Sequence, residues 1–145
     1  VIFAYSLGKA QRVMAGVDAG IGPIYTHGAV EKVTRAYRES GVALPPTTLV
    51  SDAAAGIGKG KAKSKPWPGS LVIAPPSAAG STWMRKFEPA SEGIASGWMR
   101  VRGARRWKGV DRGFVLSDHA DWPGLLDTIA ATGARRVLAT HGYTD

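Results

Sequence analysis

Cysteine is absent from this 145-residue sequence, and its absence excludes several kinds of site. Without thiols the chain forms no disulfide, offers no thiolate to a metal ion and holds no cysteine nucleophile. Any metal site must therefore use histidine and carboxylate side chains. Long apolar runs are also absent, because no stretch approaches the roughly 18 consecutive apolar residues that a membrane-spanning helix requires.

Acidic residues are scarce, since 11 Asp and Glu accompany 19 Lys and Arg and leave a formal net charge of +8. A surplus of this size indicates a polyanionic partner, most simply a nucleic acid. A protein from an Arg-rich proteome, with a basic face that only contacts solvent, would have the same balance of charged residues. Charge alone does not separate these two interpretations.

The length and composition predict one compact globular domain with a real core, because 44% of the residues are hydrophobic and 21% are charged. The sequence starts at Val1 on an apolar run and ends at Asp145 shortly after another strand-like run. We therefore expect it to be a piece of a longer polypeptide.

Short apolar runs alternate with segments whose apolar residues recur at helical spacing. Glycine and proline separate most of them, and residues 51–69, rich in Ala, Gly, Lys and Pro, are expected to form a surface loop. This alternation predicts an α/β fold, with a mostly parallel sheet and flanking helices. The expected strands are residues 1–5, 23–26, 71–74, 93–101, 113–116 and 136–140, and the expected helices are residues 7–17, 28–39, 81–87 and 122–131.

Chemically active side chains gather where two expected strands end. The stretch "GFVLSDHADW" places Asp118, His119 and Asp121 after one strand, and "VLATHG" places His141 after the next. The intervening helix would make these strands parallel neighbours, so we expect the two imidazoles to approach each other at one edge of the sheet. The alternative is structural, with Asp121 capping the helix and His119 lying on the surface.

Other motifs carry less weight. His27, in "IYTHG", is expected to start a helix, and the stretch "GIGKGKAKS" lacks the spacing of a phosphate-binding loop. Neither Ser96 nor Ser117 has the context of a nucleophilic serine. The five tryptophans are expected in the core and at interfaces, although Trp107 lies among basic residues and could stack on a nucleotide.

Several motifs together resemble one family of enzymes. The "SDHAD" and "THG" motifs, separated by an expected helix and strand, are similar to the paired histidine motifs of metallo-β-lactamase nucleases that carry a β-CASP domain. The resemblance covers nearly the whole chain. Within the family, the sequence is most like the exonuclease associated with DNA ligase in bacteria. The motifs that point to this branch are "FAYSLGKAQRVM", "PIYTHGAVEKV", "LVIAPPSA" and "ASGWMRVRG".

The resemblance implies roles for the strand-end residues. His141 would bind one of two zinc ions, and His119 would reach the scissile phosphate, either stabilising charge or protonating the leaving oxygen. Asp118 or Asp121 would orient His119. The H-x-H-x-D-H cluster that holds most of the metal in such enzymes is missing from this sequence. One imidazole does not build a two-zinc site, so we expect these residues alone to be inactive.

The resemblance also implies a domain organisation and partners. Residues 1–108 would form an incomplete β-CASP-like domain, and residues 109–145 the truncated C-terminal end of a metallo-β-lactamase-like domain. The enzyme would act in the bacterial cytoplasm on DNA in preference to RNA, together with a DNA ligase and a helicase. The nucleic-acid contacts expected here are the basic residues of the 59–65 loop and Lys9, Arg102, Arg105, Arg106 and Lys108.

Three alternatives remain open at the level of sequence. The first is an RNA-processing nuclease of the same fold, resembling the 3′-end-processing enzymes or ribonuclease J. The second is an inactive remnant that binds nucleic acid or another partner. The third is a basic α/β domain with no nucleic-acid function.

Overall fold

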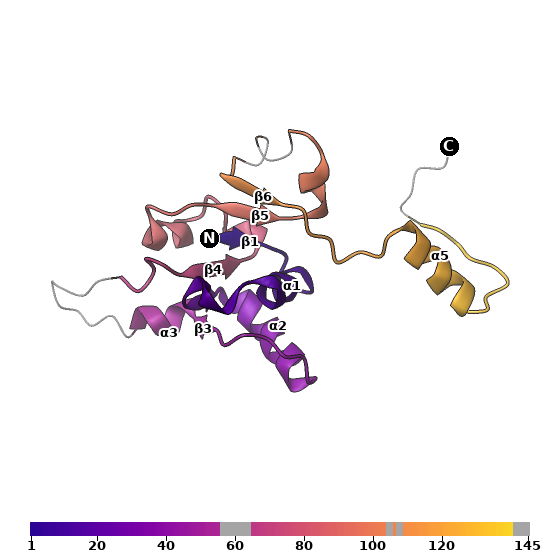
Figure 1. The fold of residues 1–145 in the computed structure, drawn as a ribbon, viewed down its shortest axis with the longest axis horizontal. Helices are drawn as coiled ribbons and strands as arrows, with labels where there is room; N and C mark the ends of the chain where they lie inside the picture. The colour runs from indigo at the N-terminus through magenta and orange to yellow at the C-terminus, as the bar shows by residue number, and fades with distance from the viewer. Residues whose placement is uncertain (56–64, 104–105, 107–108, 141–145) are drawn as a thin grey trace.

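The chain forms an α/β fold around six parallel strands in the order β3-β2-β4-β1-β5-β6 (Figure 1). This computed structural model describes residues 1–55, 65–103, 106 and 109–140. The prediction of a mostly parallel sheet with flanking helices is confirmed. The strands are β1 (Ile2–Phe3), β2 (Ile24–Thr26), β3 (Thr48–Leu49), β4 (Leu71–Ala74), β5 (Gly93–Ala95) and β6 (Arg112–Phe114).

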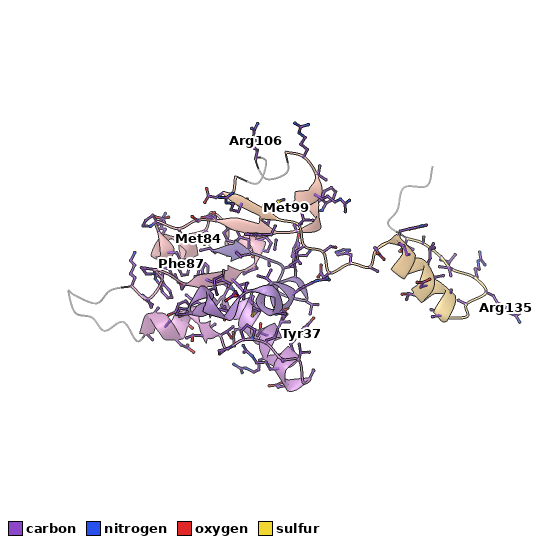
Figure 2. All side chains as sticks on the ribbon, in the orientation of Figure 1. Tyr37, Met84, Phe87, Met99, Arg106 and Arg135 are labelled. Carbon is purple, nitrogen blue, oxygen red and sulfur yellow. The ribbon has the colours of Figure 1, made fainter. Side chains whose placement is uncertain are left out.

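The two faces of the sheet bury separate hydrophobic clusters, because successive side chains of a strand point to opposite faces. The helices α1 (Lys9–Gly16) and α2 (Gly28–Glu39) contribute Val13, Met14 and Val30 to one cluster, with Ile73 of β4. On the other face Val72 of β4 packs with residues of α3 (Val50–Ala55) and of the 3-10 helix η3 (Thr82–Phe87). Figure 2 shows Met84 and Phe87 of η3 on that side. Burial on both faces explains why β4 is apolar throughout.

Two helix starts follow the sequence prediction. The Nδ1 atom of His27 accepts a hydrogen bond from the backbone N–H of Ala29 at 3.1 Å and caps α2. The Asp121 carboxylate accepts one from the N–H of Gly124 at 2.9 Å and caps α5 (Trp122–Ala131). Both side chains satisfy backbone donors that a helix leaves without an internal partner at its first turn.

The structure corrects three of the expected elements. Residues 48–55, partly assigned to a loop, form β3 and α3. The strand expected over residues 93–101 ends at Ala95, because Ser96 caps the 3-10 helix η4 (Gly97–Arg100) with its hydroxyl. Residues 136–140 are not a strand in the described part of the chain. Val137 and Leu138 are exposed there, and a β-prone run forms no ladder without a neighbouring strand.

Beyond β6 the chain leaves the sheet, and α5 lies apart from it (Figure 1). No residue of α5 is buried, and its Trp122, Leu125 and Leu126 are exposed. β6 lies beyond the expected domain boundary at residue 108 yet pairs with β5, so the sheet includes residues from both sides of that boundary. The assignment of two partial domains stays a prediction. Among the described residues, no helix is long and apolar enough to cross a membrane.

Candidate functional site

A hollow of about 610 Å³ lies where β1, β5 and β6 end. These three strands are neighbours in the sheet, so the residues that follow them meet at one edge. In open parallel sheets this carboxyl edge is where ligands bind. The hollow is lined by Tyr5, Lys9, Ser96, Gly97, Trp98, Val101, Ser117 and His119.

Lys9, which lines the hollow, forms an ion pair with Asp118. The Lys9 Nζ atom lies 3.1 Å from Asp118 Oδ1, and the two side chains are 6% and 28% exposed. The same Nζ atom lies 5.0 Å from the centre of the Tyr5 ring. Arg12 adds a second link, because its Nη1 donates to the carbonyl oxygen of Ser117 at 2.8 Å. The segment after β6 is thereby attached to the first turns of α1.

Gly8 leaves space for the Asp118 carboxylate at the start of α1. Its φ of +78° lies in the region that favours glycine, and a Cβ atom at this position would lie 2.8 Å from Asp118 Oδ2. The Asp118 carboxylate therefore sits against bare backbone at the start of α1, within reach of Lys9.

The charge state of Asp118 follows from these contacts. Burial raises the pKa of Asp118, but the hydrogen bond from Lys9, a backbone hydrogen bond and the positive charge of Lys9 outweigh it and hold the pKa below its ordinary value. The carboxylate is therefore ionised at neutral pH and compensates the buried ammonium group of Lys9.

His119 is presented to the hollow by a short turn. Its backbone N–H donates to the Ser117 hydroxyl at 3.2 Å, while its side chain is 82% exposed. The His119 Nε2 atom lies 4.0 Å from Asp118 Oδ1. The arrangement thus combines an accessible imidazole with a fixed carboxylate beside it, which suits proton transfer to a bound ligand.

Asp121 and His141 were also predicted to have catalytic or metal-binding roles. Asp121 acts as the cap of α5 and does not line the hollow. His141, the expected zinc ligand, lies outside the described residues. Within the described ranges no group of three or more His, Asp or Glu side chains could hold a metal ion. The described residues therefore do not form a zinc site by themselves.

His27, the other strand-end histidine, belongs to the packing around η3. Its ring meets the Trp83 ring at a centroid distance of 4.9 Å. Burial and, to a smaller extent, the charge of Lys86 lower the pKa of His27 below its ordinary value. The neutral imidazole is the form that can accept the capping hydrogen bond from Ala29.

The residues predicted to contact nucleic acid fall into three groups. Lys9 is buried and paired with Asp118, so its position suits holding the site together better than meeting a phosphate at the surface. Arg102 and Arg106 are exposed, and Figure 2 shows Arg106 at the outside of the fold, on the side of β6. Arg105, Lys108 and residues 59–64 of the basic loop lie outside the described residues.

Sequence reasoning missed Tyr5, Trp98 and the hydroxyl of Ser96 as parts of this hollow. Tyr5 was assigned to the strand expected over residues 1–5, whereas β1 ends at Phe3 and leaves Tyr5 beyond the strand end, where sites lie. Trp98 was assigned to a strand, and the Ser96 cap that turns the backbone there gives only a weak local signal.

Replacing Asp118 with asparagine is expected to lower the free energy of unfolding by about 2 kcal/mol. The loss falls below the roughly 3–5 kcal/mol of a fully buried pair because Asp118 keeps partial access to water. Since the folded pKa of Asp118 is lowered, the difference from wild type is present above about pH 4 and disappears as the pH falls through that pKa. Urea denaturation at several pH values measures it.

The exposed Asp127 of α5 supplies the matched control, and Asp127→Asn is expected to change stability by less than about 0.5 kcal/mol. The double variant Lys9→Met with Asp118→Asn is expected to recover part of the loss, because no buried charge remains without a partner. Equal stability of Asp118→Asn and wild type at pH 7 would show that the pair contributes nothing.

The chain is similar in sequence to a known protein. A protein described as a probable DNA ligase, from Opitutus terrae, is 32% identical over 143 residues, which cover 99% of this chain and 13% of that protein. No protein-family model matches the chain, and no solved structure matches it. The chain therefore spans only a small part of the length of this relative, and the similarity gives it a DNA-ligase-related context.

Proposed function

We propose that this chain is part of a zinc-dependent nuclease that acts on DNA as an exonuclease and works with a DNA ligase, and with a helicase, in repair. The observation that carries the catalytic part is the position of His119, accessible in a hollow at the carboxyl edge of the sheet beside the ionised Asp118. The similarity to a probable DNA ligase over nearly the whole chain supports DNA as the substrate.

The chemistry assigned to this chain is proton transfer and positioning. Cleaving a phosphodiester requires a proton donor for the leaving oxygen or a cation to stabilise the charge that develops on the phosphate. His119 serves in either role, and its Nε2 atom lies 4.0 Å from Oδ1 of the Asp118 carboxylate. Lys9 keeps Asp118 in place. The metal ligands of the nuclease would come largely from parts of the polypeptide outside these residues.

The test uses the complete polypeptide that contains this sequence. With zinc it is expected to shorten end-labelled DNA progressively and RNA of the same sequence much more slowly, and a chelator is expected to stop the reaction. The 145-residue chain by itself is expected to show no metal-dependent cleavage.

Three outcomes would contradict this proposal. Faster cleavage of RNA would favour an RNA-processing enzyme, and binding without cleavage would favour an inactive remnant. Robust zinc-dependent cleavage by the 145 residues alone would show that the chain is not an incomplete part of the enzyme.

A further inference from the structure

The hollow has an exposed aromatic side chain at its mouth that the chemistry proposed above does not use. Trp98 lies on η4 and its side chain is 73% exposed, although it is one of the largest apolar groups in the chain. It lines the same hollow as Ser117 and His119. Tyr5 and Val101, which line the same hollow, are also exposed. Exposed apolar side chains that gather beside polar groups mark surfaces that a ligand covers.

The backbone that carries Trp98 is held in place by its neighbours. The N–H of Trp98 donates to the hydroxyl of the buried Ser96 at 3.3 Å, and its carbonyl accepts from the N–H of Val101 at 2.9 Å. The adjacent Met99 packs on β6, where a Cβ atom added to Gly113 would lie 2.7 Å from the Met99 sulfur. Figure 2 shows Met99 on this part of the fold. The backbone that carries the indole is thus held beside the hollow by Ser96, Val101 and the packing of Met99.

The remaining lining supplies a second ring and groups that bind anions. Tyr5 is 61% exposed, and its ring lies close to the Lys9 ammonium. His119 and Ser117 offer hydrogen-bond donors to a phosphate. Arg100 and Arg102, two and four positions after Trp98 in the sequence, are exposed. Aromatic faces beside cationic and hydroxyl groups are the combination that binds single-stranded nucleic acid.

We infer that this hollow binds single-stranded DNA, with one base stacked on Trp98 and the adjoining phosphate facing Ser117 and His119. The choice of DNA rests on the proposed function. The choice of a single strand rests on the site itself, because a base offers its face to an indole only when it is not stacked inside a duplex. The net charge of +8 complements the charge of such a strand.

The test measures binding of the 145-residue chain to a labelled strand of about 12 thymidines by fluorescence anisotropy, with a chelator present so that no cleavage occurs. Trp98→Ala is expected to raise Kd roughly tenfold. Trp98→Phe, which keeps a ring, is expected to stay within about threefold of wild type. Binding of the wild-type chain is also expected to quench tryptophan emission, and Trp98→Phe is expected to lose most of that quenching.

The matched control is Trp122→Ala, since Trp122 of α5 is 69% exposed but does not line the hollow. It is expected to bind as wild type does. Equal effects of the Trp98 and Trp122 substitutions would overturn the inference, as would an equal loss for duplex DNA or tighter binding of RNA than of DNA. If Trp98→Ala failed to fold, the quenching in Trp98→Phe would still decide the result. Because no cleavage is measured, loss of the proposed nuclease activity would not alter this result.

Discussion

Substitution of His119 by alanine in the complete polypeptide is expected to slow DNA cleavage by roughly 100-fold or more. The His119 side chain lines the hollow and is 82% exposed to solvent, and Asp118 Oδ1 lies 4.0 Å from its Nε2 atom. Alanine removes the proposed proton donor and leaves the Lys9–Asp118 ion pair intact, so folding should change little. The single-turnover rate at saturating DNA measures the effect on the chemical step.

Two further variants make this prediction specific. His27→Asn keeps a side chain that can cap α2 and is expected to cleave DNA at close to the wild-type rate. His119→Ala is expected to retain its zinc, whereas His141→Ala is expected to lose part of it, which measurement of metal content in the purified proteins would show. Full activity of His119→Ala would remove this residue from the proposed mechanism.

Replacing Gly22 with alanine is expected to lower the free energy of unfolding by about 3–4 kcal/mol. The backbone of Gly22 has φ of +102° and ψ of −169°, a conformation that side chains strongly disfavour. An added Cβ atom would also collide with the carbonyl oxygen of Gly69, just before β4. Because this contact involves backbone on both sides, a side-chain rotation does not relieve it. Chemical denaturation monitored by circular dichroism measures the loss.

Gly41→Ala separates the cost of the backbone conformation from the cost of the steric clash. Gly41 also has a positive φ of +84°, but an added Cβ atom there would meet open space. Only the conformational cost applies, so the expected loss is about 1–2 kcal/mol. Equal losses for the Gly22 and Gly41 variants would contradict the close approach of Gly22 to Gly69.

The surroundings of the candidate site residues could be predicted from the sequence only in part, for a physical reason, and their catalytic roles stay predictions. Asp118 and His119 lie four and five positions after the end of β6, and strand ends in a parallel sheet lie where ligands bind. The role of Asp121 as a cap also follows from local sequence, because its oxygen meets the N–H of Gly124 within one helical turn. Lys9 was assigned to nucleic acid because it is basic, yet burial and pairing are properties of its surroundings in three dimensions.

The sequence by itself determined the elements whose causes are local. The unbroken apolar run of β4 predicts a strand buried on both faces, and the His27 and Asp121 caps mark where α2 and α5 begin. The alternation of strands and helices predicts the parallel sheet.

Only the tertiary structure decided the strand order and which residues share the hollow. Arg12 and Ser117 are hydrogen-bonded although 105 residues separate them, because β1 and β6 lie on either side of β5. The same distinction explains residues 136–140, whose β-prone sequence forms no strand in the described structure. A helix satisfies its backbone hydrogen bonds within itself, whereas a strand and a binding site depend on partners that the chain brings from elsewhere.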